Sequence, residues 1–384
     1  MFAYGIFKVI YAPHKAFKEI IQNPRYIGPI LIMILFIGAN AASTYTLLTK
    51  TYVEETLPTS KDEWTENSAL WRTLNGALAT ENFTDHINGN IYGNRSIEFS
   101  IKNSTKISMQ LDDIGSINCS SPDGYTKIYL RIKWTSPNVS PKNISLYLYS
   151  TTSSNYFYYN LTEKFSNLTA NIWNNLTVPF TDEKWLRSGT ADWSNITGLK
   201  LELAWLEKSN ITVLMDGLFF GGIFKSPAEN LAAYITNFSV LGFMQFVLRW
   251  VLLGGIIFIM TKVFKANTFW RVTLILIGFA LITMFIQALI NTAAFSTLPT
   301  LKYPFEYIGG VKGESETAYN KIIEEAWFVN QIYSYVQAAI ILWTIALCGI
   351  AIRFSTEFSW AKSLLIATVA YFAATTAESF LIGI

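Results

Sequence analysis

Residues 240–263 read VLGFMQFVLRWVLLGGIIFIMTKV, an apolar run whose one charged side chain before the terminal Lys262 is Arg249. A helix needs about 20 consecutive apolar residues to cross the hydrocarbon core of a bilayer. This run therefore predicts a membrane span, and four more runs of similar length flank it, at residues 27–48, 269–298, 329–352 and 361–384. The sequence predicts a bundle of five transmembrane helices.

The composition agrees with a membrane protein, because 51% of the residues are hydrophobic and 15% are charged, whereas soluble domains carry about a quarter charged residues. The formal net charge of +2 gives no signature of a nucleic-acid partner. Two cysteines, Cys119 and Cys348, and two histidines, His14 and His86, form no zinc-binding or nucleophile–base pattern.

A polar insert separates the first two spans. It contains short segments of period-two hydrophobicity bounded by Asn, Gly, Pro and Ser, which predict an antiparallel jelly roll or sandwich. The predicted strands are 96–102, 107–114, 126–136, 143–151, 155–162, 172–180, 197–206 and 210–220.

The predicted domain organisation follows from these patterns. Residues 1–50 form interfacial helices and the first span, 51–80 a stalk, 81–225 the β-sandwich, and 226–384 the remaining four spans. Within the stalk, the spacing of Ser60 and Glu63 fits a capping box and predicts a short helix over residues 61–72. A helix beginning near Ser315 is expected to continue into the fourth span.

The orientation is predicted from lysine and arginine near the ends of the spans, which favour the cytoplasmic side. With the amino terminus inside, nine bases face two acids there, Glu19 and Glu357. The bases are Lys8, Lys15, Lys18, Arg25, Lys262, Lys265, Arg271, Arg353 and Lys362. Residues 49–238 and the carboxyl terminus are then extracellular.

The insert also carries eleven N-x-S/T sequons, where its 18 asparagines would give roughly four by chance. They begin at Asn82, Asn94, Asn103, Asn118, Asn138, Asn143, Asn160, Asn167, Asn175, Asn195 and Asn210. We expect N-linked glycans on an extracellular domain; the alternative is that strands rich in Asn, Ser and Thr produce sequons by accident.

The membrane part resembles the Yip (Ypt-interacting) family of polytopic membrane proteins, in the form found in prokaryotes, archaea included. The resemblance rests on short motifs that occur in the family's order. They are Pro13-x-x-Ala16-Phe17, PRYIGP at 24–29, Gly254-Gly255, KANTFWRV at 265–272, Trp343-x-x-x-Leu347-x-Gly349-Ile350 and FSWAK at 358–362.

The insert resembles carbohydrate-binding modules of the jelly-roll type. The motifs are WNNLTVPF at 173–180, DWSNITGLKLEL at 192–203 and VLMDGLFF at 213–220. This resemblance implies a structural calcium near Asp216, with a turn-capping aspartate as the equal alternative. It also implies sugar stacking by Trp134, Trp173, Trp185, Trp193 or Trp205, although large aromatic residues in a sandwich more often belong to its core.

Arg249 and Glu378 are the one clear base and the one clear acid deep in the predicted spans. A single charge in hydrocarbon costs about 2.5–3.5 kcal/mol on insertion scales, so each requires a partner or a hydrated cavity. We predict that the two side chains meet and join the second span to the fifth. The alternative is that Glu378 stays hydrated near the outer surface while Arg249 reaches water or other polar groups.

These patterns favour a non-enzymatic membrane protein that presents an extracellular recognition domain to glycans or other cell-surface proteins. A transporter subunit with a solute-capturing ectodomain is the alternative, and a carbohydrate-active surface enzyme is a weaker one. The enzyme would need paired carboxylates from residues such as Asp112, Asp113, Asp192 and Glu202. The sequence specifies neither the ligand nor the oligomeric state.

Overall fold

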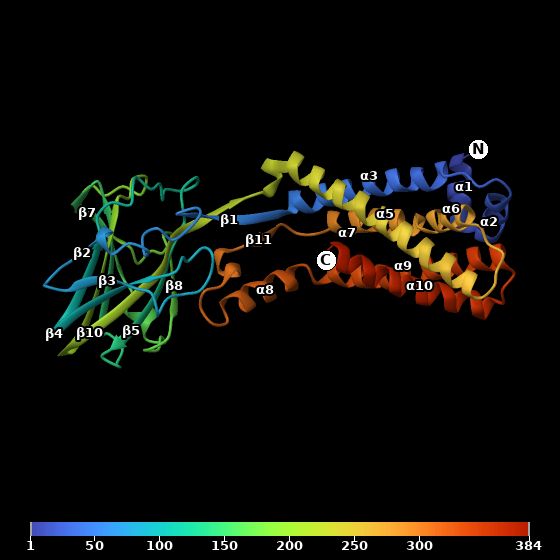
Figure 1. Ribbon diagram of the computed structural model, residues 1–384. Coiled ribbons are helices and arrows are strands. Elements are labelled where there is room, and N and C mark those ends of the chain that lie inside the picture. The colour runs from blue at the N-terminus through green and yellow to red at the C-terminus, as the bar shows by residue number, and fades with distance from the viewer. Residues whose placement is uncertain (1, 383–384) are drawn as a thin grey trace. The chain divides into compact units, whose positions relative to one another are not determined.

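A computed structural model describes residues 2–382 of the chain (Figure 1). The chain divides into two compact units. The helical unit comprises the residues up to Thr51, Ser226–Leu301, and the residues from Ile323 onward. The β unit comprises Tyr52–Lys225 and a second segment, Lys302–Ile322, which we call the strap.

The helical unit is built from two short helices and the long helices that follow them. Its elements are α1 (Phe2–Tyr11), α2 (Pro13–Gln22), α3 (Ile27–Lys50), η2 (Pro227–Asn230), α5 (Leu231–Val263), α6 (Trp270–Ala280), α7 (Ile282–Ser296), α9 (Trp327–Thr356) and α10 (Trp360–Ile382). Within the described residues, five helical segments are long and apolar enough to cross a membrane, which confirms the five predicted spans.

Small residues allow these helices to approach closely. A Cβ on Gly28 would lie 2.0 Å from the ring of Phe279, and one on Gly278 would lie 2.6 Å from the Pro29 side chain. Helix α3 packs against α5 and α7, and α10 packs against α5 and α9, around buried side chains such as Phe246. The packing therefore explains why glycines lie inside predicted spans.

The third span is not one helix, as the sequence predicted, but two. Helix α6 ends at Ala280 and α7 begins at Ile282, with Leu281 between them. The hydroxyl of Thr283 donates to the carbonyl of Ala280 at 3.3 Å and shares a hydrogen bond with Thr344 on α9 at 2.7 Å. Such back-bonding by threonine supplies a local reason for the break.

The β unit forms an antiparallel sandwich. Its strands are β1 (Thr51–Leu57), β2 (Trp71–Thr73), β3 (Leu78–Asn82), β4 (Ser96–Leu111), β5 (Lys127–Ser136), β6 (Asn143–Ser150), β7 (Thr152–Asn160), β8 (Asn174–Pro179), β9 (Leu186–Ser188), β10 (Gly198–Lys225) and β11 (Leu301–Tyr303). The short helices η1 (Ser68–Leu70) and α4 (Thr162–Phe165) connect them. The strap contains η3 (Phe305–Ile308) and most of α8 (Glu314–Glu325).

Strands β4 and β10 run through the whole sandwich, so four predicted strands merge into two. They pair from Leu199 with Leu111 to Met215 with Ile97, and a bulge lies between Ala204 and Ile211. On one side of the bulge β10 also pairs with β6, and on the other with β5 and β1. On both sides of the bulge, alternate residues of β4 and β10 point into one shared core, as the period-two pattern of apolar residues predicts.

The predicted stalk is wrong. Residues 52–80 belong to the β unit, where β1, β2 and β3 join the sheet, and no α-helix forms over residues 61–72. Trp64 and Trp71 are buried in the sandwich core, and the Asp62 carboxylate accepts hydrogen bonds from the backbone of Thr65 and Leu218. Burial of two tryptophans outweighs the local preference for a capped helix.

The strap is a second departure from the predicted domain boundaries, which placed residues 226–384 with the helices. Helix α8 begins at Glu314, close to the expected position, but it ends at Glu325 and α9 begins at Trp327. Lys302–Ile322 therefore folds with the sandwich rather than with the helices on either side of it.

Candidate functional site

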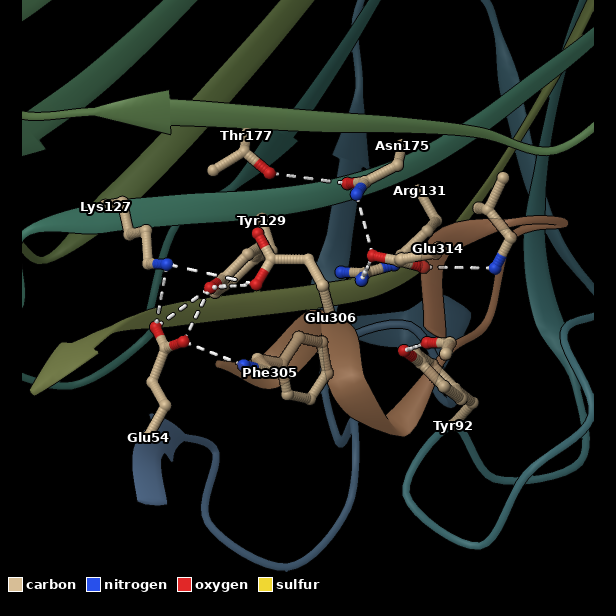
Figure 2. A network of polar contacts seen from close by, with 12 residues as sticks. Glu54, Tyr92, Lys127, Tyr129, Arg131, Asn175, Thr177, Phe305, Glu306 and Glu314 are labelled. Carbon is tan, nitrogen blue, oxygen red and sulfur yellow. Dashed lines mark hydrogen bonds and ion pairs between the residues drawn. The ribbon is translucent and has the colours of Figure 1, made fainter. Parts of the chain in front are cut away.

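The strap is held on the β unit by a buried ion pair. Arg131 on β5 is fully buried and pairs with Glu314, whose side chain is 5% exposed (Figure 2). The guanidinium lies 4.8 Å from the ring centroid of Phe305 and within 5.5 Å of those of Tyr92 and Tyr129. Cation–π contacts of this kind gain strength when they are desolvated.

Glu314 is held in place from three directions. Besides Arg131, its carboxylate accepts the Asn175 amide at 2.7 Å and the backbone N–H of Val311 at 3.1 Å. Burial raises the pKa of Glu314, although the positive charge of Arg131 opposes that shift. The Tyr92 hydroxyl donates to the Gly309 carbonyl, which fixes the glycine turn of the strap.

A second cluster joins the strap to strands β1 and β5. The Tyr129 hydroxyl donates to Glu54 at 2.8 Å and lies 3.0 Å from Glu306 (Figure 2). Glu54 also accepts the backbone N–H of Phe305 at 2.8 Å, and Lys127 lies 3.2 Å from its carboxylate. Burial and the two carboxylates hold the pKa of Tyr129 far above its usual range, so it acts as a hydrogen-bond donor.

Asp216 accepts hydrogen bonds from the backbone in the interior of the β unit. Its two carboxylate oxygens accept the N–H groups of Ile87 and Gly217, each at 2.8 Å, and the Thr65 hydroxyl lies 3.4 Å away and also donates to Asp62. Burial raises the pKa of Asp62 to about 6. Burial and the charge of Asp62 together raise the pKa of Asp216 to about 8.

This environment does not fit a calcium shell, which consists of oxygen ligands. Both oxygens of Asp216 face N–H donors, and the described residues contain no group of three or more His, Cys, Asp or Glu side chains arranged for a metal ion. The geometry favours the alternative, in which Asp216 organises the backbone around it.

The five tryptophans considered for sugar stacking pack against cores. Trp134 and Trp205 are buried, and Trp185 and Trp193 are half-buried against the sandwich core beside Phe180. Trp173 packs on a smaller cluster around Phe305. The five tryptophans therefore belong to hydrophobic cores, which is the alternative to sugar stacking.

The sequence analysis missed a tyrosine face on the outer side of β6 and β7. Tyr147 lies 5.5 Å from Tyr156 and 5.1 Å from Tyr158, measured between ring centroids, and all three rings are half-buried. Tyr149 adjoins Tyr156 at 6.4 Å. The signal was present, because tyrosines at alternate positions of two paired strands must share one face.

Polar side chains continue this face across β10 and β4. The Lys200 ammonium lies 4.0 Å from the Tyr147 ring centroid and 3.2 Å from Glu202, and Lys106 lies 3.0 Å from Glu202. Burial disfavours the ionised Glu202, but the two lysines outweigh it and hold the pKa of Glu202 below its usual value. Glu202 is thus an ionised acceptor rather than a general acid.

Eight of the sequon asparagines are exposed, and Asn82, Asn175 and Asn195 are half-buried. The Nδ2 atoms of Asn82 and Asn175, which a glycan would modify, donate to Glu98 and Glu314, each at 2.7 Å. Asn143 and Asn160 lie at one end of the tyrosine face, paired with Ala204 and Ser145.

In the helical unit, the structure brings Arg249 and Glu378 together. Arg249 Nε lies 2.7 Å from Glu378 Oε2, and its Nη2 lies 3.1 Å from Oε1, which is a two-point contact between α5 and α10. The side chains are 15% and 6% exposed. Two-point arginine–carboxylate contacts are among the strongest polar interactions in proteins.

Comparison with known families bears on the helical unit. Residues 204–377 match the Yip1 domain. This confirms the resemblance inferred from the short motifs: a membrane protein with five candidate spans carries a helical part that is similar to the Yip1 domain. The match begins inside β10 and leaves α1, α2 and α3 outside. No curated protein sequence matches the chain.

Several solved structures resemble the sandwich weakly. A carbohydrate-binding module of the β-sandwich superfamily is 12% identical with a TM-score of 0.30, and the match covers 42% of this chain and 62% of that one. A β-1,2-glucanase from Parabacteroides distasonis is 8% identical with a TM-score of 0.32, covering 42% and 24%. The CBM22-1 xylan-binding domain from Paenibacillus barcinonensis is 11% identical with a TM-score of 0.21, covering 43% and 90%.

The pair between α5 and α10 generates the first prediction. Arg249→Met or Glu378→Gln alone should destabilise the protein in detergent by about 3 kcal/mol, because each leaves a buried charge without its partner. The double variant should lose clearly less than the sum of the two. A double-mutant cycle, measured by thermal unfolding, gives the coupling energy between the two side chains. If the losses of stability in the single variants add up to the loss in the double variant, the contact contributes no energy.

The buried aspartates generate a prediction of pH dependence. Both have folded pKa values above the unfolded value of 3.8, so the folded state binds more protons and gains stability as the pH falls. Thermal unfolding of the full chain, followed by tryptophan fluorescence, should shift upward between about pH 8.5 and about pH 6. Asp216→Asn should flatten this slope.

Asp192→Asn is the matched control for that measurement, since Asp192 is exposed and its pKa is lowered by hydrogen bonds from Ser194. It should retain the wild-type slope. Calcium added to chelator-treated protein should leave the unfolding temperature unchanged. A calcium-dependent rise that Asp216→Asn abolishes would establish a metal site in place of the hydrogen-bonded aspartate.

Proposed function

We propose that the protein binds glycans at the cell surface through the tyrosine face of its β unit and does so without catalysis. The observation that carries this proposal is the cluster of Tyr147, Tyr156 and Tyr158, which are half-buried on one sheet face beside the ion pair of Lys200 with Glu202. Tyrosine rings supply apolar surfaces for sugar rings, and their hydroxyls supply hydrogen bonds. Lys200 adds a donor in the row of Tyr147, and Glu202 adds an acceptor in the neighbouring row of the same face, opposite Ser145.

The register explains how such a face forms. Gln110, Lys200, Tyr147 and Tyr158 lie side by side in one row across β4, β10, β6 and β7. Their chain neighbours point into the sandwich core, so burial of the core residues orients the row outward. The row therefore provides a platform several residues wide.

The proposal places the β unit and the carboxyl terminus outside the cell, the amino terminus inside, and N-linked glycans on the exposed sequons. Its supports are the nine bases at one end of the helical unit and the exposure of eight sequon asparagines. Asn82 and Asn175 are expected to remain unmodified, because glycosylation would break their contacts with Glu98 and Glu314.

Glycan binding is tested with the purified full chain on an array of neutral and acidic polysaccharides. Tyr147→Ala and Tyr156→Ala should each weaken binding about three- to tenfold, as expected for one aromatic contact. Tyr156→Phe should keep most of the affinity. Phe83→Ala is the control, since Phe83 is an exposed aromatic residue of the same unit outside the face.

Binding that is equal in the wild type and both alanine variants would assign the sugar to another surface. A wild-type chain that retains no polysaccharide would exclude glycan recognition by this unit.

The orientation generates a separate prediction. In a background without Cys119 and Cys348, a cysteine at Asn267 should be shielded from an impermeant thiol reagent in intact cells, and one at Lys312 should react. Both positions are exposed, so burial does not decide the outcome. Labelling at Asn267 with protection at Lys312 would invert the proposed topology.

A further inference from the structure

A small cavity opens among the helices at the end of the helical unit that carries the excess of lysine and arginine. Its volume is about 200 Å³, and it lies among α1, α2, the start of α3, and α6. Its lining consists of Gly5, Ala16, Glu19, Ile20, Asn23, Arg25, Gly28 and Phe279.

The floor and the rim of this cavity differ in chemistry. Ala16, Gly28 and Phe279 are buried, and the ring of Phe279 rests on Gly28, which has no side chain to keep it away. The rim residues Asn23 and Arg25 are exposed, and Arg25 Nε donates to Asn23 Oδ1 at 3.2 Å. The cavity is therefore apolar at depth and polar at its opening.

The charge around the rim favours an anion. Glu19, the one acid of the lining, pairs with Lys8. Arg271 contacts both chain neighbours of Arg25: its guanidinium is 5.9 Å from the Tyr26 ring centroid and donates to the Pro24 carbonyl at 3.3 Å. Nine bases face two acids at this end of the unit.

We propose that this cavity binds one anionic glycerophospholipid, with the phosphate at Arg25 and Asn23 and the glycerol and first acyl carbons against Ile20 and Phe279. An arginine fork suits phosphate oxygens, and the apolar floor suits hydrocarbon. The carboxylate of Glu19, neutralised by Lys8, accepts a hydrogen bond from a hydroxyl of the lipid head group. Helices α1 and α2 lie outside residues 204–377, which match the Yip1 domain, and Phe279 is the one residue of the lining within them.

The site is tested on the full chain in detergent by native mass spectrometry. Delipidated protein is titrated with dioleoyl phosphatidylglycerol or dioleoyl phosphatidylcholine, and bound lipids are counted. The wild type should retain one phosphatidylglycerol about five- to tenfold more tightly than phosphatidylcholine, the preference expected for one well-placed arginine.

Two variants address the two ends of the cavity. Arg25→Gln should remove most of this preference. Gly5→Leu should lower the affinity for both lipids by filling the cavity, and it should fold, because nothing lies within 4 Å of a Cβ at this position. Lys15→Gln is the matched control, since Lys15 is exposed on α2 outside the lining and its loss removes the same charge.

Retention of phosphatidylglycerol that is unchanged in both variants, or reduced equally by Lys15→Gln, would overturn the proposal. Displacement of the lipid by excess inorganic phosphate would also overturn it, because the site would then recognise a free anion. Persistence of the lipid in excess phosphate supports the combined contribution of head group and hydrocarbon.

Discussion

Burying the guanidinium of Arg131 is the constraint on which the β unit depends. A buried charge without a partner costs several kcal/mol, and β5 offers no carboxylate to Arg131 from within its own strand. The partner, Glu314, lies 183 residues further along the chain, beyond two membrane spans. The sandwich is therefore complete only when the strap folds onto it and brings Phe305 and Glu306 with Glu314.

Strand β10 joins the features of the β unit to one another. Its first part carries Lys200 and Glu202 of the tyrosine face, its second part carries Asp216, and it ends at Lys225, one residue before the helical unit resumes in the sequence. With the strap, the chain passes between the two units four times. A ligand on the tyrosine face would thus contact a strand that is covalently continuous with η2 and α5.

Much of the architecture could be predicted from the sequence because its causes are local. Long apolar runs predict the membrane spans. The alternation of apolar and polar residues predicts the strands β5, β6, β7 and β8. Arg249 and Glu378 could be paired in advance because charges at membrane depth have few alternatives. Their side chains lie in contact in the structure.

The remaining features depend on distant contacts. The capping-box spacing at Ser60 predicted a helix that the burial of Trp64 and Trp71 prevents. No local sequence pattern assigns the strap to the β-sandwich. The last long strand of the sandwich, β10, ends some 80 residues before the strap begins. The tyrosine face required the pairing of β6 with β7, which alternation within either strand does not specify.

Amide hydrogen exchange on the full chain tests most directly whether the strap and the sandwich fold as one unit. Peptides from Lys302–Ile322 should be protected together with β5, and Glu314→Ala should release both while α9 and α10 stay protected. Glu316→Ala, at an exposed glutamate of the same helix, should change neither. A strap that exchanges at the rate of an unprotected loop while β5 remains protected would contradict the account.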